Sequence, residues 1–284
     1  MNQPELPAHP WDLRTIVVLC LVHLGAILAL FHFSWSGFFL AGFLYSLTSL
    51  GITLGYHRLL THQSYRAPTW LAYTLVTLAA LSVQAGPATW VAIHRHHHAN
   101  SDREEDPHDA SRGFWWSHVG WMLKLTPRRL APDFTERRAQ DVLRVPYYKF
   151  LDKNFFVLSL MSLAMLYEYG GLSWLLWAGF ARIAAVFHGT WLVNSAAHRY
   201  GYRSYNTRDL STNCWWVALL TFGEGWHNNH HAFPRSARHG LEAREFDLSW
   251  LLLEKLEQLG FVERVRTPTE EEKARREDAA LPAR

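Results

Sequence analysis

Residues 37–62 read GFFLAGFLYSLTSLGITLGYHRLLTH and combine the two features on which the interpretation of this chain depends. The first 20 of these residues carry no charged side chain. A run of that length is sufficient for a helix to cross the ~30 Å hydrocarbon layer of a bilayer. His57 and His62 follow directly at its end. The stretch therefore predicts a transmembrane helix that ends in two candidate metal ligands.

Further apolar runs on both sides predict more membrane-spanning helices. Residues 15–33 are interrupted only by His23, and residues 155–197 carry only Glu168 and Arg182 as charges, with two glycines at 170–171. We therefore predict an all-α membrane protein with four transmembrane helices in two hairpins, at about residues 15–33, 37–56, 150–168 and 172–194. Arg182 falls deep in the fourth helix, where a lipid-facing charge is costly, so we expect it to face the protein interior.

Residues 69–93 are also uncharged. A single crossing there would place His57 and His62 on the opposite side of the membrane from His94. Two crossings need about 40 residues, which this run does not have. We therefore predict an interfacial helix over about residues 69–93, broken near Gly86.

Charge is segregated along the chain. Lys and Arg fill the central and C-terminal segments and are absent from the hairpin tips, which predicts that both termini and the long polar segments are cytoplasmic.

We expect a single domain over residues 1–284, with a cytoplasmic helical cap at 94–149 and 198–262 and a charged tail at 263–284. Within these segments, residues 246–259 have the apolar spacing of a docking helix, and residues 270–284 are expected to be frayed or disordered. The formal net charge of +3 and the lack of a basic run with interleaved aromatics exclude a nucleic-acid partner.

The chain holds 17 histidines, and many of them are grouped. They form an H-x4-H pair, two H-x-x-H-H clusters and a lone NSAAH element: His57 and His62; His94, His97 and His98; His227, His230 and His231; and His198. Residues three and four apart share a helix face, so each cluster can direct at least two imidazoles at one point. Nine histidines exceed the capacity of one ion, which implies two. Imidazole alone does not select the metal, but two ions with open positions suit dioxygen activation better than zinc hydrolysis.

Five motifs in a fixed order carry a family resemblance: GYHRLLTH (55–62), WVAIHRHHHANSDREEDPH (90–108), GFWWSHVGW (113–121), WLVNSAAHRYG (191–201) and GEGWHNNHH (223–231). In this combination the chain resembles the membrane-bound fatty acyl desaturases of the stearoyl-CoA (delta-9) type. The resemblance implies two iron ions ligated by the nine histidines named above, with Asn194 reaching one iron through a water. It also implies an enzyme that uses O2 and external electrons to introduce a cis double bond into a saturated acyl chain, at the delta-9 position.

Carboxylates are expected to orient the imidazoles, and Asp102, Asp106 and Glu224 are the candidates. His96 falls on a variable position of its motif and is left out of the ligand set, as are His108 and His118, which suit supporting or substrate-contact roles. The remaining histidines are expected to be packing or surface residues: His9, His23, His32, His188 and His239.

The acyl chain is expected to enter a bent apolar tunnel. At 1.5 Å per residue, Tyr45 lies about 18 Å and Ala41 about 24 Å along the second helix from His57, so we hypothesise that they close its methyl end. The acyl carrier stays open between acyl-CoA and acyl-lipid, because residues 90–93 (WVAI) replace charged residues of the acyl-CoA members. No fused redox module is visible, which predicts a separate electron donor of the ferredoxin or cytochrome b5 type, with Arg137, Arg138 and the basic tail as candidate docking residues.

Two other functions compete with desaturation. A di-iron fatty acyl hydroxylase would use the same ligands and add oxygen to the chain, where a desaturase removes two hydrogens. A membrane metal-binding or transport protein without redox turnover is disfavoured, because transport ligands are expected near the membrane midplane whereas these histidines lie at helix ends and in soluble segments.

Overall fold

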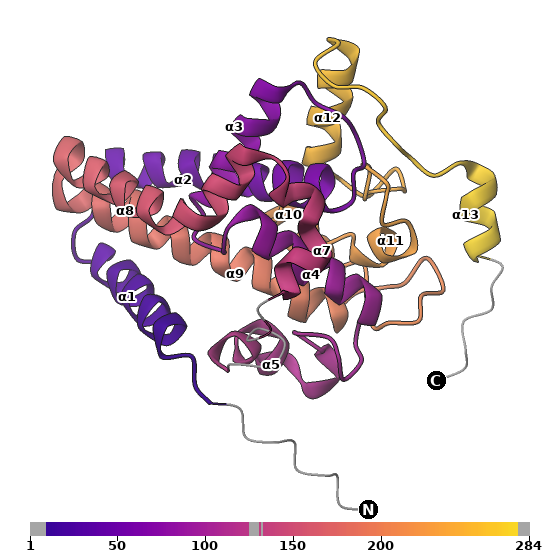
Figure 1. The fold of residues 1–284 in the computed structure, drawn as a ribbon, viewed down its shortest axis with the longest axis horizontal. Coiled ribbons are helices and arrows are strands. Elements are labelled where there is room, and N and C mark those ends of the chain that lie inside the picture. The colour runs from indigo at the N-terminus through magenta and orange to yellow at the C-terminus, as the bar shows by residue number, and fades with distance from the viewer. Residues whose placement is uncertain (1–9, 125–130, 132, 278–284) are drawn as a thin grey trace, which may run out of the picture.

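The computed structural model describes residues 10–124, 131 and 133–277, and these residues form helices and loops with isolated bridges but no strand. The prediction of an all-α protein is therefore confirmed (Figure 1). The α-helices are α1 (Leu13–Ala29), α2 (Trp35–Leu50), α3 (Thr69–Ala80), α4 (Pro87–Asn100), α5 (Phe114–His118), α7 (Phe134–Leu143), α8 (Pro146–Trp174), α9 (Arg182–Ser195), α10 (Trp215–Leu220), α11 (His227–Ala232), α12 (Leu248–Gln258) and α13 (Glu270–Glu277). Two π-helices, η1 (Gly51–Thr61) and η4 (Leu175–Ala181), and three 3-10 helices, η2 (Ala110–Arg112), η3 (Gly120–Leu123) and η5 (Ala196–His198), complete them.

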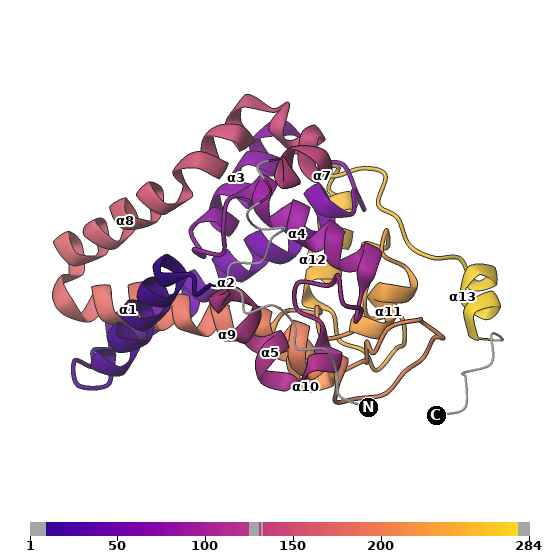
Figure 2. The same ribbon diagram turned by 60° about the horizontal axis from the view of Figure 1, so that its bottom comes forward.

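Among the described residues, two helical segments are long and apolar enough to cross a membrane. One runs from Trp35 to Thr61 and contains 27 residues, and the other runs from Pro146 to His198 and contains 53. The second reverses direction at Gly171, where φ is 64° and ψ is −161°. Figure 2 shows α8 running outward and η4 and α9 returning beside it. The predicted turn at 170–171 is thus present, although α8 begins four residues before the predicted span.

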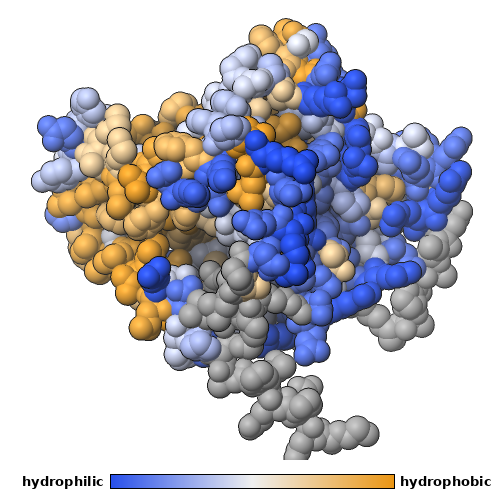
Figure 3. All heavy atoms as spheres, viewed as in Figure 1, coloured by the Kyte–Doolittle hydropathy of each residue, from blue (hydrophilic) through white to orange (hydrophobic). Residues whose placement is uncertain are grey.

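Apolar side chains gather at one end of the molecule (Figure 3). Large hydrophobic residues of α1, α2 and α8 are exposed there, among them Leu21, Phe39 and Met161. The opposite end, which carries α11 and α13, is mostly hydrophilic (Figures 1 and 3). Arg182, at the start of α9, is only 4% exposed and donates hydrogen bonds to the carbonyl oxygens of Ala178 and Leu81. Its guanidinium faces the protein interior, as expected, and backbone carbonyls are its partners.

The apolar run 69–93 forms two helices instead of one. α3 ends at Ala80, and α4 begins at Pro87, a residue that is favoured in the first helical turn and cannot continue a preceding helix. A side chain on Gly86 would clash with the backbone of Asp152, and the Asp152 carboxylate accepts a hydrogen bond from the Thr89 backbone nitrogen. The predicted break near Gly86 is therefore confirmed, and α4 continues past the predicted end at residue 93 to Asn100.

Two glycines of η1, the π-helix that continues α2, allow α3 to pack tightly against it. A Cβ on Gly51 would clash with the backbone of Ala79, and one on Gly55 would lie 2.9 Å from the carbonyl carbon of Leu75. These two glycines face α3 within η1, so the close contact fixes the position of the wide helical turns that carry the first histidine pair.

The C-terminal part of the chain packs against η1. α12 begins at Leu248, inside the predicted docking helix 246–259. The expectation of fraying or disorder over residues 270–284 is wrong for residues 270–277, which form α13. A capping box stabilises its start, because Thr269 and Glu272 exchange side-chain hydrogen bonds with each other's backbone nitrogens, and Lys273 pairs with Glu270 at 2.8 Å. Residues 278–284 lie outside the described part of the chain.

Candidate metal centre

The nine histidines predicted as ligands converge into two adjacent groups. In each group the candidate ligand atoms lie within 4.8 Å of one another. The first group contains His57, His62, His94, His98 and His230, and the second contains His97, His198, His227 and His231. His98 and His231 stack at a ring-centroid distance of 4.6 Å, so the groups are direct neighbours. The arrangement therefore offers two metal sites, one with five and one with four imidazoles.

Helical spacing explains how each H-x-x-H-H cluster serves both groups. On α4, His94 and His98 are one turn apart and enter the first group, while His97 enters the second. On α11 the roles reverse, because His227 and His231 enter the second group and His230 enters the first. Each helix thus contributes an i,i+4 pair to one site and a single ring to the other.

A π-helix brings the H-x4-H pair together. In η1 the backbone nitrogen of His62 donates to the carbonyl oxygen of His57, five residues earlier, at 3.1 Å. Residues five apart face different sides of an α-helix, whereas the wider π-turn aligns them. The two rings accordingly lie 4.8 Å apart between centroids.

Four of the nine rings are held through Nδ1 by buried or nearly buried carboxylates, in both groups. The pairs are His57 with Glu224 at 2.6 Å, His97 with Asp106 at 2.8 Å, His198 with Asp102 at 2.8 Å and His231 with Asp209 at 3.0 Å. A carboxylate accepts a hydrogen bond only from a protonated Nδ1, so the neutral form of each of these rings carries its proton on Nδ1. Their Nε2 atoms are then bare lone pairs directed into the two groups.

The bare Nε2 atoms show which kind of ligand would fit the two groups. His97 and His231 each donate Nδ1–H to a carboxylate, and their Nε2 atoms lie 3.4 Å apart in the buried interior. Two lone pairs at that distance repel each other and cannot form a hydrogen bond. The Nε2 atom of His198 is buried and has no protein partner. A cation between these atoms removes the conflict, which is why the donor set fits a bound metal ion.

Electrostatics lower the pKa of several rings of the centre and keep the carboxylates ionised, whereas the pKa of His198 is raised, because Asp102 outweighs the effect of burial. Burial lowers the pKa of His98 and His230 well below the usual range, and neighbouring imidazoles lower it further. Burial would raise the pKa of Asp106, but His97 and His108 hold it far below its usual value. A metal ligand must be a deprotonated imidazole, so the lowered pKa values of the rings favour metal binding at neutral pH.

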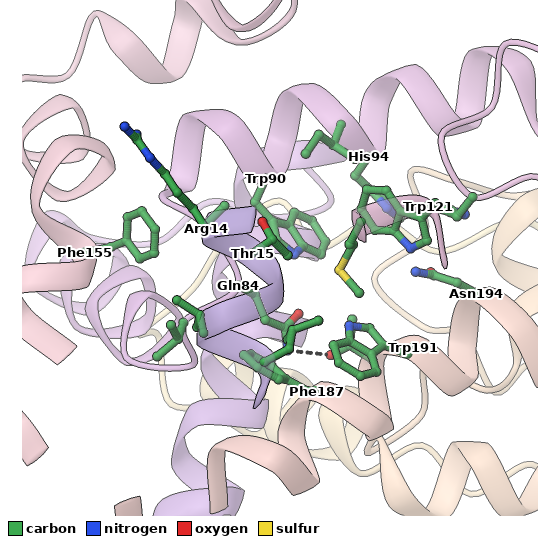
Figure 4. Close-up of a pocket in the computed structure, with 18 of the residues that line it drawn as sticks. Arg14, Thr15, Gln84, Trp90, His94, Trp121, Phe155, Phe187, Trp191 and Asn194 are labelled. Atoms are coloured by element: carbon green, nitrogen blue, oxygen red, sulfur yellow. Dashed lines mark hydrogen bonds between the residues drawn. The ribbon is translucent and has the colours of Figure 1, made fainter. Parts of the chain in front are cut away.

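A cavity of about 520 Å³ leads to the first group. Its walls are largely apolar and come from α1, α4, α8 and α9, with Trp90, Phe187 and Trp191 among them. Figure 4 shows His94 and Asn194 at one end of this cavity and Arg14 and Phe155 toward the other. A smaller cavity of about 50 Å³ continues past the same His94 and Asn194 to Tyr45. The histidine centre thus adjoins an apolar channel.

Comparison with known proteins identifies the family. Residues 33–245 match the family model described as fatty acid desaturase. The chain is 50% identical over 249 residues to the sn-1 stearoyl-lipid 9-desaturase of Anabaena variabilis, covering 86% of this chain and 90% of that protein. The chain belongs to the fatty acid desaturase family. It is 45% identical over 253 residues to the sn-1 stearoyl-lipid 9-desaturase of Synechocystis sp., covering 88% of this chain and 78% of that one. To the sn-2 palmitoyl-lipid 9-desaturase of Nostoc sp. it is 42% identical over 266 residues, covering 93% and 92%.

The chain is therefore a fatty acyl desaturase, an oxidoreductase, as its histidine motifs predicted. The carboxylates predicted to support the rings of this desaturase all contact histidines. Asp102 and Asp106 lie on the loop after α4, where Asp106 also accepts a hydrogen bond from the Asp102 backbone nitrogen at 2.8 Å. Glu224 precedes α11, accepts a hydrogen bond from Thr53 and forms an ion pair with Arg58. These interlocking bonds fix the loops that carry the carboxylates.

Other predicted residues of the desaturase lie beside the centre. Asn194 lines both cavities. His108 lies 4.2 Å from His97 between ring centroids and lines the larger cavity, whereas His118 bonds to Ser195 and His188 away from the two groups. The Nδ1 atom of His96 lies 3.0 Å from Nη2 of Arg138, so this ring faces α7.

His239, which was expected to be a packing or surface residue, is buried beside the centre. It is fully buried, its Nδ1 lies 3.5 Å from Glu224, and its ring centroid lies 4.5 Å from that of His230. Nothing in its local sequence indicates this position, because a loop places it there. Among the other histidines without a motif, His23 and His188 contact each other at 3.1 Å, His32 is exposed, and His9 lies outside the described residues.

Asp209 is the functional candidate that sequence reasoning missed. It lies in a loop 22 residues before His231, and no periodic pattern connects the two. Its carboxylate accepts from His231 and from the backbone nitrogen of Ser211. Only the folded loop brings it to the second histidine group.

We expect Asp209→Asn to weaken metal binding at the second group by about 10–100-fold, because the amide no longer fixes the proton of His231 on Nδ1. Competition with a chelator during metal titration measures the change. Asp133→Asn, at an exposed ion pair with Arg137, is the matched control and should leave affinity unchanged. Equal affinities for the Asp209 variant and the unaltered desaturase would contradict a supporting role.

Proposed function

We propose that this desaturase is a di-iron enzyme that introduces a cis double bond at the delta-9 position of an acyl chain carried by a membrane lipid. The observation that carries the proposal is the convergence of bare Nε2 atoms in two neighbouring groups beside an apolar cavity. Relatives at 42–50% identity are named lipid 9-desaturases, which supports the bond position and the carrier.

The nine imidazoles would hold two iron ions, five rings at one site and four at the other, with Asn194 completing the second through a water. Iron bound there would couple the reduction of O2 to the removal of two hydrogens from the acyl chain. The overall reaction converts one CH2–CH2 pair of the acyl chain to CH=CH. It consumes one O2, two external electrons and two protons, and it yields two waters. The task of the protein is to hold one carbon pair near His94 and to exclude water.

The two cavities support a path for the acyl chain. The larger one offers an apolar wall from Phe155 to Trp90, and the smaller one continues from His94 to Tyr45. Because both contain His94 and Asn194, a chain that fills them must bend beside the histidines. Ala41 is buried one turn beyond Tyr45 and contributes to neither cavity, so Tyr45 is the residue proposed to meet the methyl end.

The exposed apolar end supports a membrane topology with four spans: α1, α2, α8, and η4 with α9. Each lies at the end where large hydrophobic side chains are exposed, and the hairpin tips there carry no Lys or Arg. We therefore place both termini and the histidine centre on the cytoplasmic side. The outer wall of the larger cavity comes from α1 and α8, so a lipid-borne chain can enter from the bilayer between them.

Expression in cells followed by lipid extraction tests the proposed function. We expect lipids that have lost two hydrogens, with the new double bond between carbons 9 and 10, and about two irons per purified chain. A product that has gained oxygen would indicate the hydroxylase instead. Bound metal without any altered lipid would support the metal-binding alternative.

We expect Tyr45→Ala to shift the product profile toward longer chains, because truncation enlarges the far end of the smaller cavity. Since each methylene in an apolar pocket is worth about 1–3 kcal/mol, the ratio of 20-carbon to 18-carbon turnover should rise roughly tenfold or more. Chromatography of the products from mixed substrates measures this ratio. Tyr169→Ala, at a residue 76% exposed, is the control. An unchanged profile for Tyr45→Ala would place the methyl end elsewhere.

A further inference from the structure

A basic groove lies on the side of the protein nearest α11. It has a volume of about 590 Å³ and runs between the loop after α11 and α13. Among the described residues, four arginines line it, Arg235, Arg266, Arg275 and Arg276, together with a single carboxylate, Glu272. All four arginine side chains are exposed. The groove therefore combines a positive rim with open access from solvent.

Backbone hydrogen bonds hold one wall of the groove in place. The Arg266 backbone nitrogen donates to the carbonyl oxygen of Ser64 at 2.9 Å, and the Ala237 nitrogen donates to the carbonyl oxygen of Arg266 at 2.7 Å. Nearby, Arg66 and Glu263 exchange two backbone bonds of 2.8 and 2.9 Å. The segment that carries Arg266 is thus attached both to the chain after η1 and to the loop after α11.

The other wall is α13, which the capping box at Thr269 stabilises. The Arg276 guanidinium lies over the ring of Phe233 at 5.5 Å, and this contact connects α13 to the loop after α11. Among the described residues, none of the four arginines forms an ion pair with a carboxylate. Their charge is therefore available to a partner.

The floor of the groove is continuous with the metal centre. Ala232 and Phe233 line it, and they directly follow His230 and His231 on the chain. The Phe233 backbone nitrogen donates to the carbonyl oxygen of Asn229, inside α11. A molecule in the groove would touch the helix that supplies ligand candidates to both histidine groups.

The position of the groove argues against a lipid occupant. α13 lies at the end of the molecule opposite the hairpin tips, on the hydrophilic side (Figures 1 and 3). Anionic lipid headgroups attract basic residues only within about a Debye length of the membrane surface. A soluble acidic protein can reach this end without competing with the bilayer.

We propose that the groove is the docking site for an acidic one-electron carrier protein. The inference rests on the proposed function, because each double bond formed needs two external electrons. Acidic side chains of the carrier meet the four arginines, and its redox centre is brought toward Phe233. Opposite charge speeds the encounter of the two proteins, as for other complexes with complementary fields.

The test uses the full-length desaturase in detergent and a reduced acidic [2Fe–2S] ferredoxin as probe. We expect Arg235→Glu with Arg275→Glu to raise the KM for the ferredoxin about tenfold or more and to remove most of its salt dependence. Activity driven by dithionite and a small dye should stay unchanged, because neither arginine contacts the centre or the cavity. The Kd for ferredoxin, measured by calorimetry, should rise by a similar factor whether or not the protein turns over.

Arg137→Glu tests the rival basic surface on α7, where Arg137 is exposed and pairs with Asp133. It should change neither the KM nor the Kd for ferredoxin. The proposal is overturned if the double variant binds ferredoxin as tightly as the unaltered protein, or if only Arg137→Glu weakens binding. It is also overturned if the double variant loses binding to phosphatidylglycerol vesicles while its Kd for ferredoxin is unchanged. Absence of any desaturated product from the unaltered protein, with ferredoxin binding intact, would instead count against the proposed function alone.

Discussion

His230→Ala is expected to abolish desaturation, with a loss of at least about 10³-fold, and to reduce bound iron from two ions to about one per chain. The Nε2 atom of His230 lies 3.0 Å from that of His57 and 3.0 Å from that of His98, so this ring occupies the middle of the first group. Its removal opens one coordination position and leaves the other Nε2 atoms without the cation that offsets their repulsion. Product analysis and metal analysis of the same purified sample measure the two effects.

The expected pattern for His230→Ala is asymmetric, and the asymmetry is the sharper test. The second group keeps all four of its rings, so its ion should remain. His32→Ala, at an exposed histidine in the loop between α1 and α2, controls for the loss of an imidazole and should retain full activity and two irons. If His230→Ala keeps both irons, the division into groups of five and four rings is wrong. If His230→Ala loses both irons, metal binding at one site depends on metal binding at the other.

The regular spacing of the H-x4-H and H-x-x-H-H elements predicted clustered imidazoles, whereas the full set of nine, with the lone His198, was implied by the family resemblance. Histidines at three and four residues apart share a helix face, and this local rule needs no tertiary structure. The same rule could not divide the rings between two sites, because the crossing of α4 and α11 decides that His97 joins His227 while His94 joins His230. Nor could it align His57 with His62, since their spacing matches a π-helix that few sequences adopt.

The residues that sequence reasoning missed are those placed by loops. Asp209 and His239 reach the centre from segments without helical or alternating periodicity, and their contacts depend on chain segments far apart in the sequence. The helix α13 was missed for a different reason. Its composition resembles a disordered tail, but the capping box at Thr269 and the ordered charges along eight residues give it local stability.

Asp247→Ala is expected to destabilise the folded protein by about 3–5 kcal/mol, the largest stability effect that the structure indicates outside the ligand set. The side chain of Asp247 is 1% exposed, and the Arg58 guanidinium from which it accepts hydrogen bonds is fully buried. Taking away the carboxylate leaves this charge with Glu224 as its remaining acidic partner, at 3.4 Å. Asp247 also caps α12 by accepting from the Trp250 nitrogen at 2.9 Å, which contributes about 1 kcal/mol.

Graded variants separate the two contributions of Asp247. Asparagine keeps a good helix cap but loses the charge, so Asp247→Asn should fall between the unaltered protein and Asp247→Ala when thermal unfolding is followed in detergent. Asp133→Ala removes an exposed partner of Arg137 and should stay within about 0.5 kcal/mol. Because Arg58 follows His57 and contacts Glu224, weaker iron retention should accompany the loss of stability. Unchanged unfolding for Asp247→Ala would show that water replaces the carboxylate at Arg58, and that the buried pair does not fix the histidine-bearing turn of η1.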